Sequence, residues 1–526
     1  MGVFATIRRA FSRPAEHNRP DLRALMDRGE RSIRGRYDAA SEPVDMVSHW
    51  AVSDCLDADM ANSLAVRKKL RNRSRLERAN NAYAAGMIQT HANVVVGVGP
   101  SLRMQTGTTS FNQMVEAKWA LWCKATGFLR KLRTMHTAKT GDGEGFGRIK
   151  TNPAIVDQVK IDVHLMECDQ VSSAWLPYGE ANHIDGVWFD EFGNPVSYDV
   201  LPYHPGSSAP MGVSSQSEKV EARFMLHWFR ADRPGQHRGI PEITPALMSF
   251  AQGRRWREAV IAAAETAADF AAVMEMGVGG NQDADVAQPF TTMPIEKRMF
   301  VASPAGAKMQ QLKAEQPATG YEVLNRSLLC EQGRPLGMSY VIAALDSSAS
   351  SFSGGKLDQL NYRVVVNVDR ADGEAMVLDR LFALWFFEAV KVYGWTVAQE
   401  PAPKHSWDWP GMPQIDDQKT ATARKTSLSC GVASLGRFYA EDGLDFEDEV
   451  AAMAAEYGID VEEMKARILD ANFPKTPAPE APADEPSDED EEPSDEDESD
   501  EEKPANDKAK ANGHVNRLLG FGAGMQ

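Results

Sequence analysis

The stretch "MLHWFRADRPGQHRGIPEITPAL", residues 225–247, marks the main division of the chain. A region of short strands, residues 141–230, ends within it, and a helix is expected to begin after Gly239. We predict that this helix runs from Pro241 to Met276, because the pattern stays helical and is mostly alanine near its end. Small side chains let neighbouring helices approach closely, which suits a packed assembly.

The strand-rich region before this stretch alternates apolar and polar positions between Gly, Asn and Pro turns. This pattern predicts a small α+β domain of short strands. Within it, "GDGEGFG" at 141–147 lacks the strand–turn–helix frame of a dinucleotide site, and we interpret it as a loose turn. A helical pattern at 111–138 is expected to supply core aromatic residues, namely Trp119, Trp122 and Phe128.

The pattern from Ser48 to Thr90 is also helical, and it carries a basic cluster. The cluster consists of Arg67, Lys68, Lys69, Arg71, Arg73, Arg75 and Arg78. Two interpretations remain open: a solvated helix face, or a surface that contacts phosphate or an acidic partner.

Beyond the first long helix, two more helices are predicted over 321–336 and 357–392. The second becomes apolar nearly all round at 378–390, which is typical of a helix buried against several neighbours. Ser, Ala and Gly dominate residues 346–355 between them, so a flexible loop is expected there. Residues 416–470 predict two or three further helices.

The net charge of −18 is concentrated in one place. Residues Glu480–Glu502 hold 15 acidic residues and no basic one, which leaves −18 + 15 = −3 for the rest of the chain. Such a body lacks the surplus of Lys and Arg that tight duplex binding needs, but it can still surround DNA. From Pro474 onward the composition is that of a disordered tail.

The five cysteines are scattered and form no C-x-x-C pair. This usage fits reduced thiols in a cytoplasm and argues against a disulfide framework or a zinc site. No apolar run is long enough to span a bilayer, so we expect a soluble protein with no membrane contact.

The sequence offers little catalytic chemistry. Ser353 and Lys356 match S-x-x-K, in which the Lys activates the Ser one helical turn away, but the two glycines between them weaken such a helix. The 11 histidines form no metal-ligand spacing. We therefore expect no catalytic site, no metal and no cofactor.

Several segments resemble one family, the portal proteins of lambda-like tailed phages. They are "NNAYAAGMIQTHANVVVGVG", "WALWC", "DGEGFGRI", "HLMECDQVSSAW", "HIDGVWFDEFGNPVSYDVLPYHPG", "DSSASSFSGGKLDQLNYR" and, most specific of all, the stretch 225–247. In that stretch Phe229, Arg230, Arg233, Pro234, Gly235, Gln236, Arg238, Gly239 and Pro241 follow in the expected order. The resemblance covers roughly residues 50–460.

This resemblance implies a structural protein and no enzyme. Such proteins form a ring, usually of twelve subunits, at one capsid vertex, through which double-stranded DNA is packaged and ejected. The implied partners are the terminase large subunit, the head-completion or connector proteins, the scaffold and the major capsid protein. The implied location is the virion, after assembly in the host cytoplasm.

The resemblance also implies a division into regions. An α+β wing (48–240) follows a basic N-terminal arm (1–47). Stem helices and a small mixed clip (241–340), a tunnel loop (341–356), a long wing helix (357–400), a helical crown (401–473) and a disordered acidic tail (474–526) complete the chain.

The tunnel loop implied by the resemblance would face DNA with Ser348, Ser350, Ser351, Phe352, Ser353 and Lys356. Short neutral hydroxyls suit a channel in which DNA must slide, because strong phosphate binding at each step would hold it. Arg254, Arg255 and Arg257 either point into the channel or pair with a neighbouring subunit's acids, and we favour pairing. The alternatives are another head protein, such as a scaffold or connector, and a serine hydrolase using Ser353 and Lys356.

Overall fold

The computed structural model describes nine stretches of the chain. They are residues 53–172, 182–208, 217–269, 273–276, 307–310, 318–348, 350–398, 401–412 and 417–473. The predictions for the arm 1–47 and the tail 474–526 lie outside these residues. The chain divides into two compact units, Met1–Ile468 and Leu469–Gln526.

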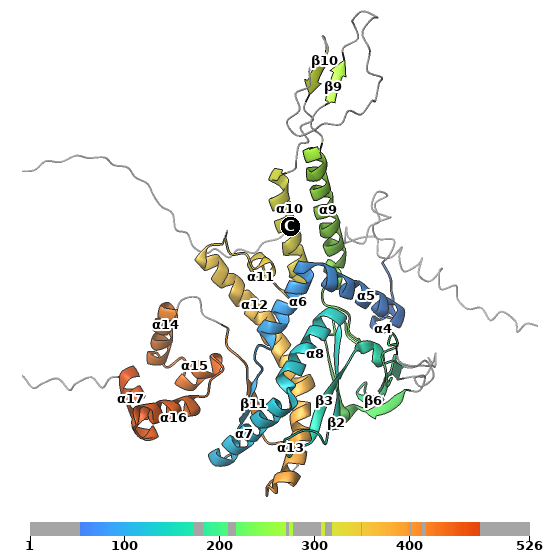
Figure 1. Cartoon of the computed structure of the whole chain (residues 1–526). Coiled ribbons are helices and arrows are strands. Elements are labelled where there is room, and N and C mark those ends of the chain that lie inside the picture. The colour runs from blue at the N-terminus through green and yellow to red at the C-terminus, as the bar shows by residue number, and fades with distance from the viewer. Residues whose placement is uncertain are drawn as a thin grey trace, which may run out of the picture. The chain divides into compact units, whose positions relative to one another are not determined.

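Helices open the described chain, as the pattern predicts. They are α4 (Ala58–Ala61), α5 (Leu64–Asn80), α6 (Ala82–Val95), α7 (Thr109–Thr126) and α8 (Phe128–Asp142) (Figure 1). The helical segment predicted over 111–138 is two helices, because Gly127 adopts a left-handed conformation (φ 62°) that caps α7. The predicted core aromatics Trp119, Trp122 and Phe128 are confirmed as buried.

The predicted short strands are confirmed and form two antiparallel sheets. The first has the order β3-β2-β8, with β2 at Glu144–Thr151, β3 at Ile161–Met166 and β8 at Met225–Phe229. The second has the order β4-β5-β6-β7, with strands His183–Ile184, Val187–Phe189, Pro195–Val200 and Glu218–Glu221. The fold is therefore mixed α+β, mostly helical with small antiparallel sheets.

The interpretation of "GDGEGFG" as a loose turn is wrong. Gly143 ends α8 with φ +97°, and β2 begins at the next residue, Glu144. A Cβ at Gly143 would lie 2.4 Å from the carbonyl carbon of Ile240, and one at Gly145 would lie 2.5 Å from the Met135 carbonyl oxygen. Glycine is needed because the chain passes closely against other backbone at these points.

The helix predicted over Pro241–Met276 is shorter at both ends. A 3-10 turn at Thr244–Ala246 precedes α9, which spans Leu247–Asp269. Prolines at 241 and 245 lack an amide hydrogen and restrict the residues before them, so the α-helix starts after the second one. Val273–Met276 is a strand, β9, which pairs antiparallel with β10 (Ala307–Gln310).

The next helices follow the predicted order. They are α10 (Ala318–Gly333) with a 3-10 turn to Leu336, α11 (Tyr340–Ala344) and α12 (Phe352–Gly373). A π-helical segment, Glu374–Leu378, joins α12 to α13 (Asp379–Tyr393). The third predicted helix thus starts at Phe352 rather than Leu357. Its apolar run is confirmed as buried, at Leu381, Phe382, Trp385, Phe386, Ala389 and Val390.

The proline-rich segment between α13 and Asp417 contains a strand that the sequence did not reveal. β11 (His405–Asp408) pairs antiparallel with β1 (Ser101–Met104), far earlier in the chain. Four helices follow rather than two or three: α14 (Asp417–Ser429), α15 (Leu435–Glu441), α16 (Phe446–Tyr457) and α17 (Val461–Asn472).

The main core joins α6, α7 and α8 to α12 and α13. Trp119 is its centre, with its ring edge-on to Trp385 at 5.1 Å and to Phe382 at 5.6 Å between centroids.

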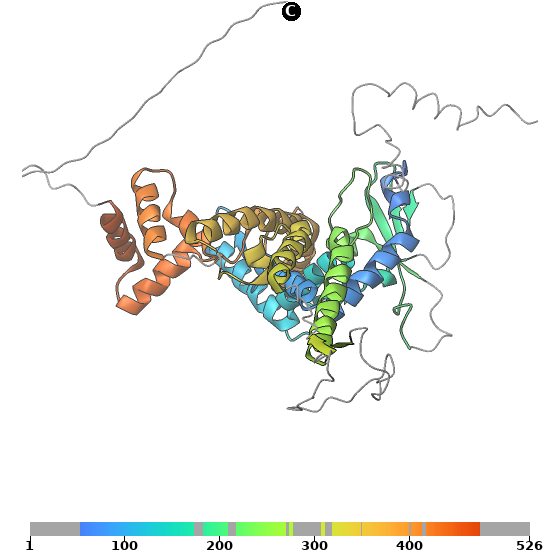
Figure 2. The same cartoon turned by 90° about the horizontal axis from the view of Figure 1, so that it is seen from above.

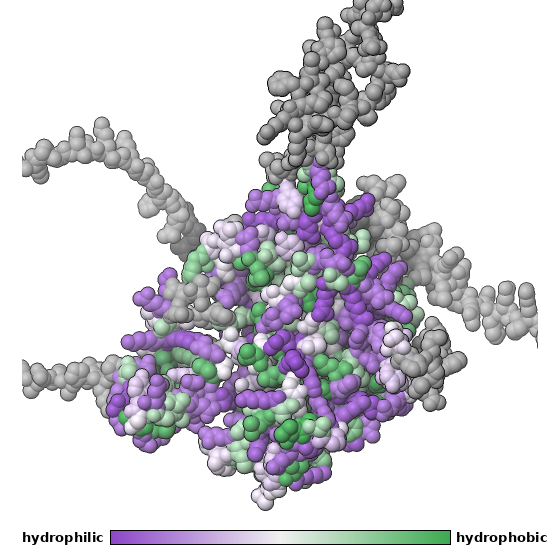
Figure 3. Space-filling view, in the orientation of Figure 1, coloured by the Kyte–Doolittle hydropathy of each residue, from purple (hydrophilic) through white to green (hydrophobic). Residues whose placement is uncertain are grey.

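Seen from above, α9 lies beside α5, which it contacts (Figure 2). On the face shown in Figure 3, apolar patches lie among hydrophilic residues. Within the described residues, no helix combines the length and the apolar character needed to cross a membrane.

Candidate functional site

The segment from Leu345 to Lys356 joins α11 to α12, includes the first turn of α12 and holds the six residues predicted to face DNA in the tunnel loop. It begins at Leu345, which ends α11 in the left-handed conformation (φ 52°) with 77% of its surface exposed. Asp346 then accepts hydrogen bonds from the Ser348 amide (3.0 Å) and the Tyr340 hydroxyl (3.1 Å). These bonds, first that of Ser348, lower the pKa of Asp346, so the segment carries a fixed negative charge at its start.

The second half of this segment is helix rather than loop, which corrects the prediction for 346–355. Ser351 caps α12, and its Oγ accepts a hydrogen bond from the Gly354 amide at 3.1 Å. A serine cap satisfies a free amide in the first turn, so it offsets the low helix propensity of the glycines that follow. Phe352 and Lys356 therefore project from a helix end.

The predicted site residues of this segment are exposed together. Those on it are Ser348, Ser350, Ser351, Phe352, Ser353 and Lys356. The Ser350 Oγ bonds to the Ser347 carbonyl (2.9 Å), and the ammonium of Lys419 lies 5.0 Å from the centre of the Phe352 ring. A surface of hydroxyls with one aromatic ring and one cation can touch a polyanion without holding it strongly.

The three arginines on α9 differ in their surroundings. Arg254 pairs with Glu77 of the same chain at 3.2 Å, and the Arg257 guanidinium lies 5.4 Å from the centre of the Tyr83 ring. Arg254 therefore has an acid partner within its own chain, and the expected pairing of these arginines with a neighbouring subunit's acids stays a prediction. Arg255 is exposed, and no acid among the described residues pairs with it.

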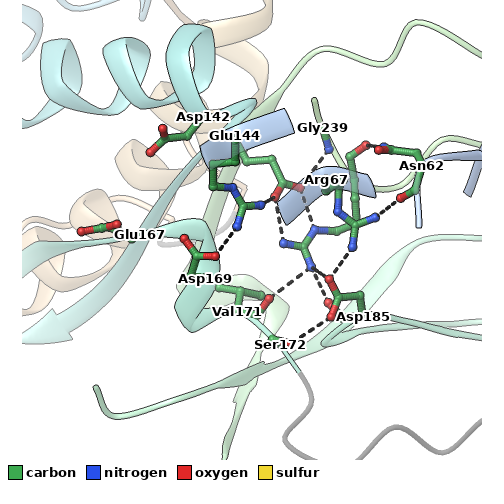
Figure 4. Close-up of polar contacts among 12 residues, drawn as sticks. Asn62, Arg67, Asp142, Glu144, Glu167, Asp169, Val171, Ser172, Asp185 and Gly239 are labelled. Atoms are coloured by element: carbon green, nitrogen blue, oxygen red, sulfur yellow. Dashed lines mark hydrogen bonds and ion pairs between the residues drawn. The ribbon is translucent and has the colours of Figure 1, made fainter. Parts of the chain in front are cut away.

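Part of the basic cluster on α5 is buried, so at those positions it forms neither a solvated helix face nor a surface for phosphate or an acidic partner. Arg67 and Arg71 are buried: Arg67 pairs with Asp185, and Arg71 Nη1 donates to Asp169 Oδ1 at 2.6 Å (Figure 4). Arg75 is partly buried and bonds to Asp142 with both Nε (3.0 Å) and Nη2 (2.9 Å). The remaining members of the cluster, Lys68, Lys69, Arg73 and Arg78, are exposed.

Glu144 is the central acid of this group, which we call the Glu144 network. Arg238 donates from Nε to Oε1 (2.6 Å) and from Nη2 to Oε2 (2.8 Å), and the Gly239 amide donates to Oε1 at 2.9 Å (Figure 4). Burial alone would raise the pKa of Glu144, but the charge and hydrogen bonds of Arg238 and the contact with His227 together outweigh it, so the pKa lies well below its usual range. The network joins the start of β2 to the chain just before α9.

A second buried polar group surrounds Asp369 on α12. His91 Nε2 (3.0 Å) and His136 Nε2 (3.1 Å) meet its Oδ2, and Lys139 Nζ donates to Oδ1 at 2.6 Å. Burial would raise the pKa of Asp369, but the hydrogen bonds of the two histidines and the charge of Lys139 hold it below its usual range. Burial lowers the pKa of His136 to about 4.

His91, His136 and Asp369 offer ligand atoms within 4.8 Å of one another, which is close enough for a metal ion. The surroundings do not fit one. Lys139 lies between Asp369 and Glu242, at 2.6 and 2.8 Å, so a cation already neutralises these carboxylates. The group is better described as a buried hydrogen-bonded network that holds α6, α8 and α12 together.

Neither network was predicted from the sequence. One signal was available: Arg67, Arg71, Ser74 and Glu77 have helical spacing and are the buried positions of α5, and all four are polar, so their burial requires polar or charged partners. Those partners lie far away in the sequence, and only the fold brings them together.

The chain is similar in structure to subunits of gene transfer agent (GTA) particles. A chain of the native virion has 12% identity and a TM-score of 0.42, over 73% of this chain and 97% of that one. A chain of the neck of the empty particle has 12% identity and a TM-score of 0.42, over 72% and 94%. A chain of the neck of the native particle, computed with C12 symmetry, has 13% identity and a TM-score of 0.38, over 71% and 94%.

No curated protein matches the sequence. The family model of the phage portal proteins of the lambda family does match it, over residues 51–370. This match covers more than half of the 526 residues, and includes both networks, α9 to α11 and most of α12. The chain therefore belongs to the lambda family of phage portal proteins.

Proposed function

We propose that twelve copies of this chain close into a ring at one vertex of the capsid, and that double-stranded DNA passes through the central hole during packaging and ejection. The match to the lambda family of portal proteins over residues 51–370 is the observation that carries this proposal. Twelve is the subunit number that the resemblance to lambda-like portals implies. Rotational symmetry would close such a ring through head-to-tail interfaces.

A phage portal protein is a structural component of the virion and not an enzyme. The hydrolase alternative built on Ser353 and Lys356 is therefore wrong for this chain. Both residues are exposed near the start of α12, so neither is shielded from water there.

The exposed segment from Leu345 to Lys356 is proposed to line the narrowest part of the hole. Its hydroxyl groups are short and neutral, so each contact with a phosphate is weak, and DNA can slide from one contact to the next. Phe352 supplies a soft apolar contact, and Lys356 supplies one positive charge per subunit. Asp346 supplies one negative charge to the same segment, so the segment is neutral overall and gives the duplex no deep energy minimum at any one position.

The named regions and partners follow the same resemblance. We assign the α+β part to the wing, α9 and α10 to the stem, the β9–β10 pair to the clip, and α14 to α17 to the crown. The clip would dock the terminase large subunit and later the head-completion proteins, whereas the scaffold and the major capsid protein would contact the outside of the ring. Arg254, Arg255 and Arg257 on α9 stay candidates for a contact with DNA or with a neighbouring subunit, and Arg255 is the exposed one of the three.

Genome filling tests this function. Particles assembled without the chain should contain no packaged DNA, and adding back the wild-type chain should restore filling. A variant with Ser348, Ser350 and Ser353 changed to Lys keeps the Ser351 cap and should still assemble into particles, but it should package DNA more slowly because the added charges bind phosphate. Normal filling of particles that lack the chain would overturn the proposal.

A further inference from the structure

An exposed row of apolar residues runs along the outer face of α12, with the exposed Asn361 and Asn367 at its edges. Leu357, Leu360, Val364 and Val368 recur every three or four residues, which places them on one side of the helix. Their exposed fractions are 58, 50, 64 and 58%, and the exposed Ala371 continues the row. We call these five residues the α12 stripe.

The opposite face of α12 is already occupied within the subunit. Tyr362, Val366 and Asp369 are buried there, against α6 and the Asp369 network. A helix with one wet face carries polar residues on it, whereas α12 is apolar on the outer side too. Helix propensity does not account for valine at these exposed positions, because valine is a poorer helix former than lysine or glutamate. The sequence is suited to a helix that is covered on both sides.

The shape of the stripe limits what can cover it. Fifteen residues from Leu357 to Ala371 rise about 21 Å along the helix axis. The face of a single helix is convex, whereas small molecules bind in concave pockets. An extended apolar row of this length fits the surface of another protein chain.

We propose that in the assembled ring the α12 stripe is buried against a neighbouring copy of this chain. The inference rests on the proposed ring and names one of its contact surfaces. In a ring with rotational symmetry, two different faces of the same chain must complement each other.

A second copy offers a matching face on α10. Val323 (71% exposed) and Leu324 (42%) are apolar there, and Glu322 and Glu331 are exposed beside them. Arg326 on α10 and Arg334 directly after it are exposed as well, and the α12 stripe is bordered by Arg363 on one side and Asp372 on the other. Each face therefore has charges of both signs at its edge, which can pair with charges of the other face. Apolar centres with complementary charges at the rim are the arrangement found in protein interfaces.

The test uses the full chain and one charged substitution with a matched control. Val364→Asp places a carboxylate in the middle of the stripe, and Val156→Asp makes the same change at a loop residue that is 96% exposed. The wild type and V156D should form rings, whereas the ring fraction of V364D should fall at least tenfold in native mass spectrometry. The circular dichroism spectrum of V364D should match that of the wild type. Rings of V364D at wild-type yield would overturn the inference.

A gentler pair of variants covers the case in which V364D fails to fold. V364C and V156C are purified as rings and labelled with a maleimide, and peptide mass spectrometry follows each site. The V364C site should label at least tenfold more slowly than the V156C site, and equal rates would overturn the inference. If the wild type forms no ring at all, the proposed function fails first, so the two failures are distinguishable.

Discussion

Arg238 and Glu144 form a bidentate ion pair in the interior, with N–O distances of 2.6 and 2.8 Å and side chains that are 1% and 0% exposed. Arg238 lies in the stretch 225–247, and Glu144 lies at the start of β2. The pair therefore joins the chain that leads into α9 to the sheet, so it fixes how the helix leaves the α+β part.

Glu144→Gln should destabilise the fold by about 3–5 kcal/mol, because it leaves Arg238 buried beside Arg71 without a full countercharge. Urea unfolding of the two proteins measures the difference. Glu218→Gln is the control, because it breaks an exposed ion pair with Arg148. Such a pair contributes less than about 1 kcal/mol to the free energy of unfolding. Equal losses in the two variants would contradict the structural role of the buried pair.

Gly143→Ala should cost more stability than Gly235→Ala. Both glycines have positive φ, +97° and +74°, so alanine is strained by about 1–2 kcal/mol at either site. A Cβ at Gly143 would also meet the backbone of Ile240 at 2.4 Å, whereas nothing lies within 4 Å of one at Gly235. The midpoint of thermal unfolding, measured for both variants, compares them. A lower midpoint for the Gly235 variant than for the Gly143 variant would contradict the close approach of Gly143 to the Ile240 backbone.

Ser351→Ala should fray the first turn of α12 and cost about 1 kcal/mol, because the Gly354 amide loses its acceptor. Amide exchange at residues 354–356 should become faster. Ser351→Asp should restore slow exchange, because Asp also caps helices. Ser353→Ala changes an exposed serine inside the helix and serves as the control, with exchange expected to stay close to that of the wild type.

Acid should destabilise the protein through His136. Its pKa is lowered to about 4 in the folded state by burial, against about 6.5 in the unfolded chain, so the unfolded state takes up the proton first. Stability is complete above pH 6.5 and is lost as the pH falls toward 4, by up to about 3 kcal/mol. Below that window, Asp369 adds to the loss, since its pKa is also lowered.

The measurement is the free energy of unfolding between pH 7 and pH 4, in the wild type and in His136→Asn. The variant should be less stable at pH 7 but should lose less stability on acidification. His227 is also buried with a lowered pKa, so His227→Asn should independently reduce the change in the free energy of unfolding with pH. An unchanged slope in His136→Asn would mean that this histidine already carries its proton at neutral pH.

Regular patterns in the sequence predicted much of the fold. The strands of the two sheets and the buried run of α13 follow from alternation and from an apolar helix surface, which are local properties. The ends of α9 did not follow, because its start depends on two prolines and its end on pairing with β10, more than 30 residues later. The β1–β11 pair was missed for the same reason, since only the folded chain brings these strands together.

The candidate site divides in the same way. The sequence predicted that residues from Ser348 to Lys356 would be exposed, because Ser and Lys are mostly exposed in folded proteins. It did not predict that Ser351 caps a helix that begins at Phe352. It also did not predict that Arg67 and Arg71 form ion pairs with acidic residues in the interior. Those outcomes depend on partners that are distant in sequence or on backbone geometry, and neither leaves a periodic signal.

Electron microscopy of the purified full chain in negative stain tests the central claim most directly. Closed rings with a central hole and twelvefold symmetry are the predicted result. Particles that are rods or irregular oligomers, or a chain that stays monomeric under all assembly conditions, would contradict it.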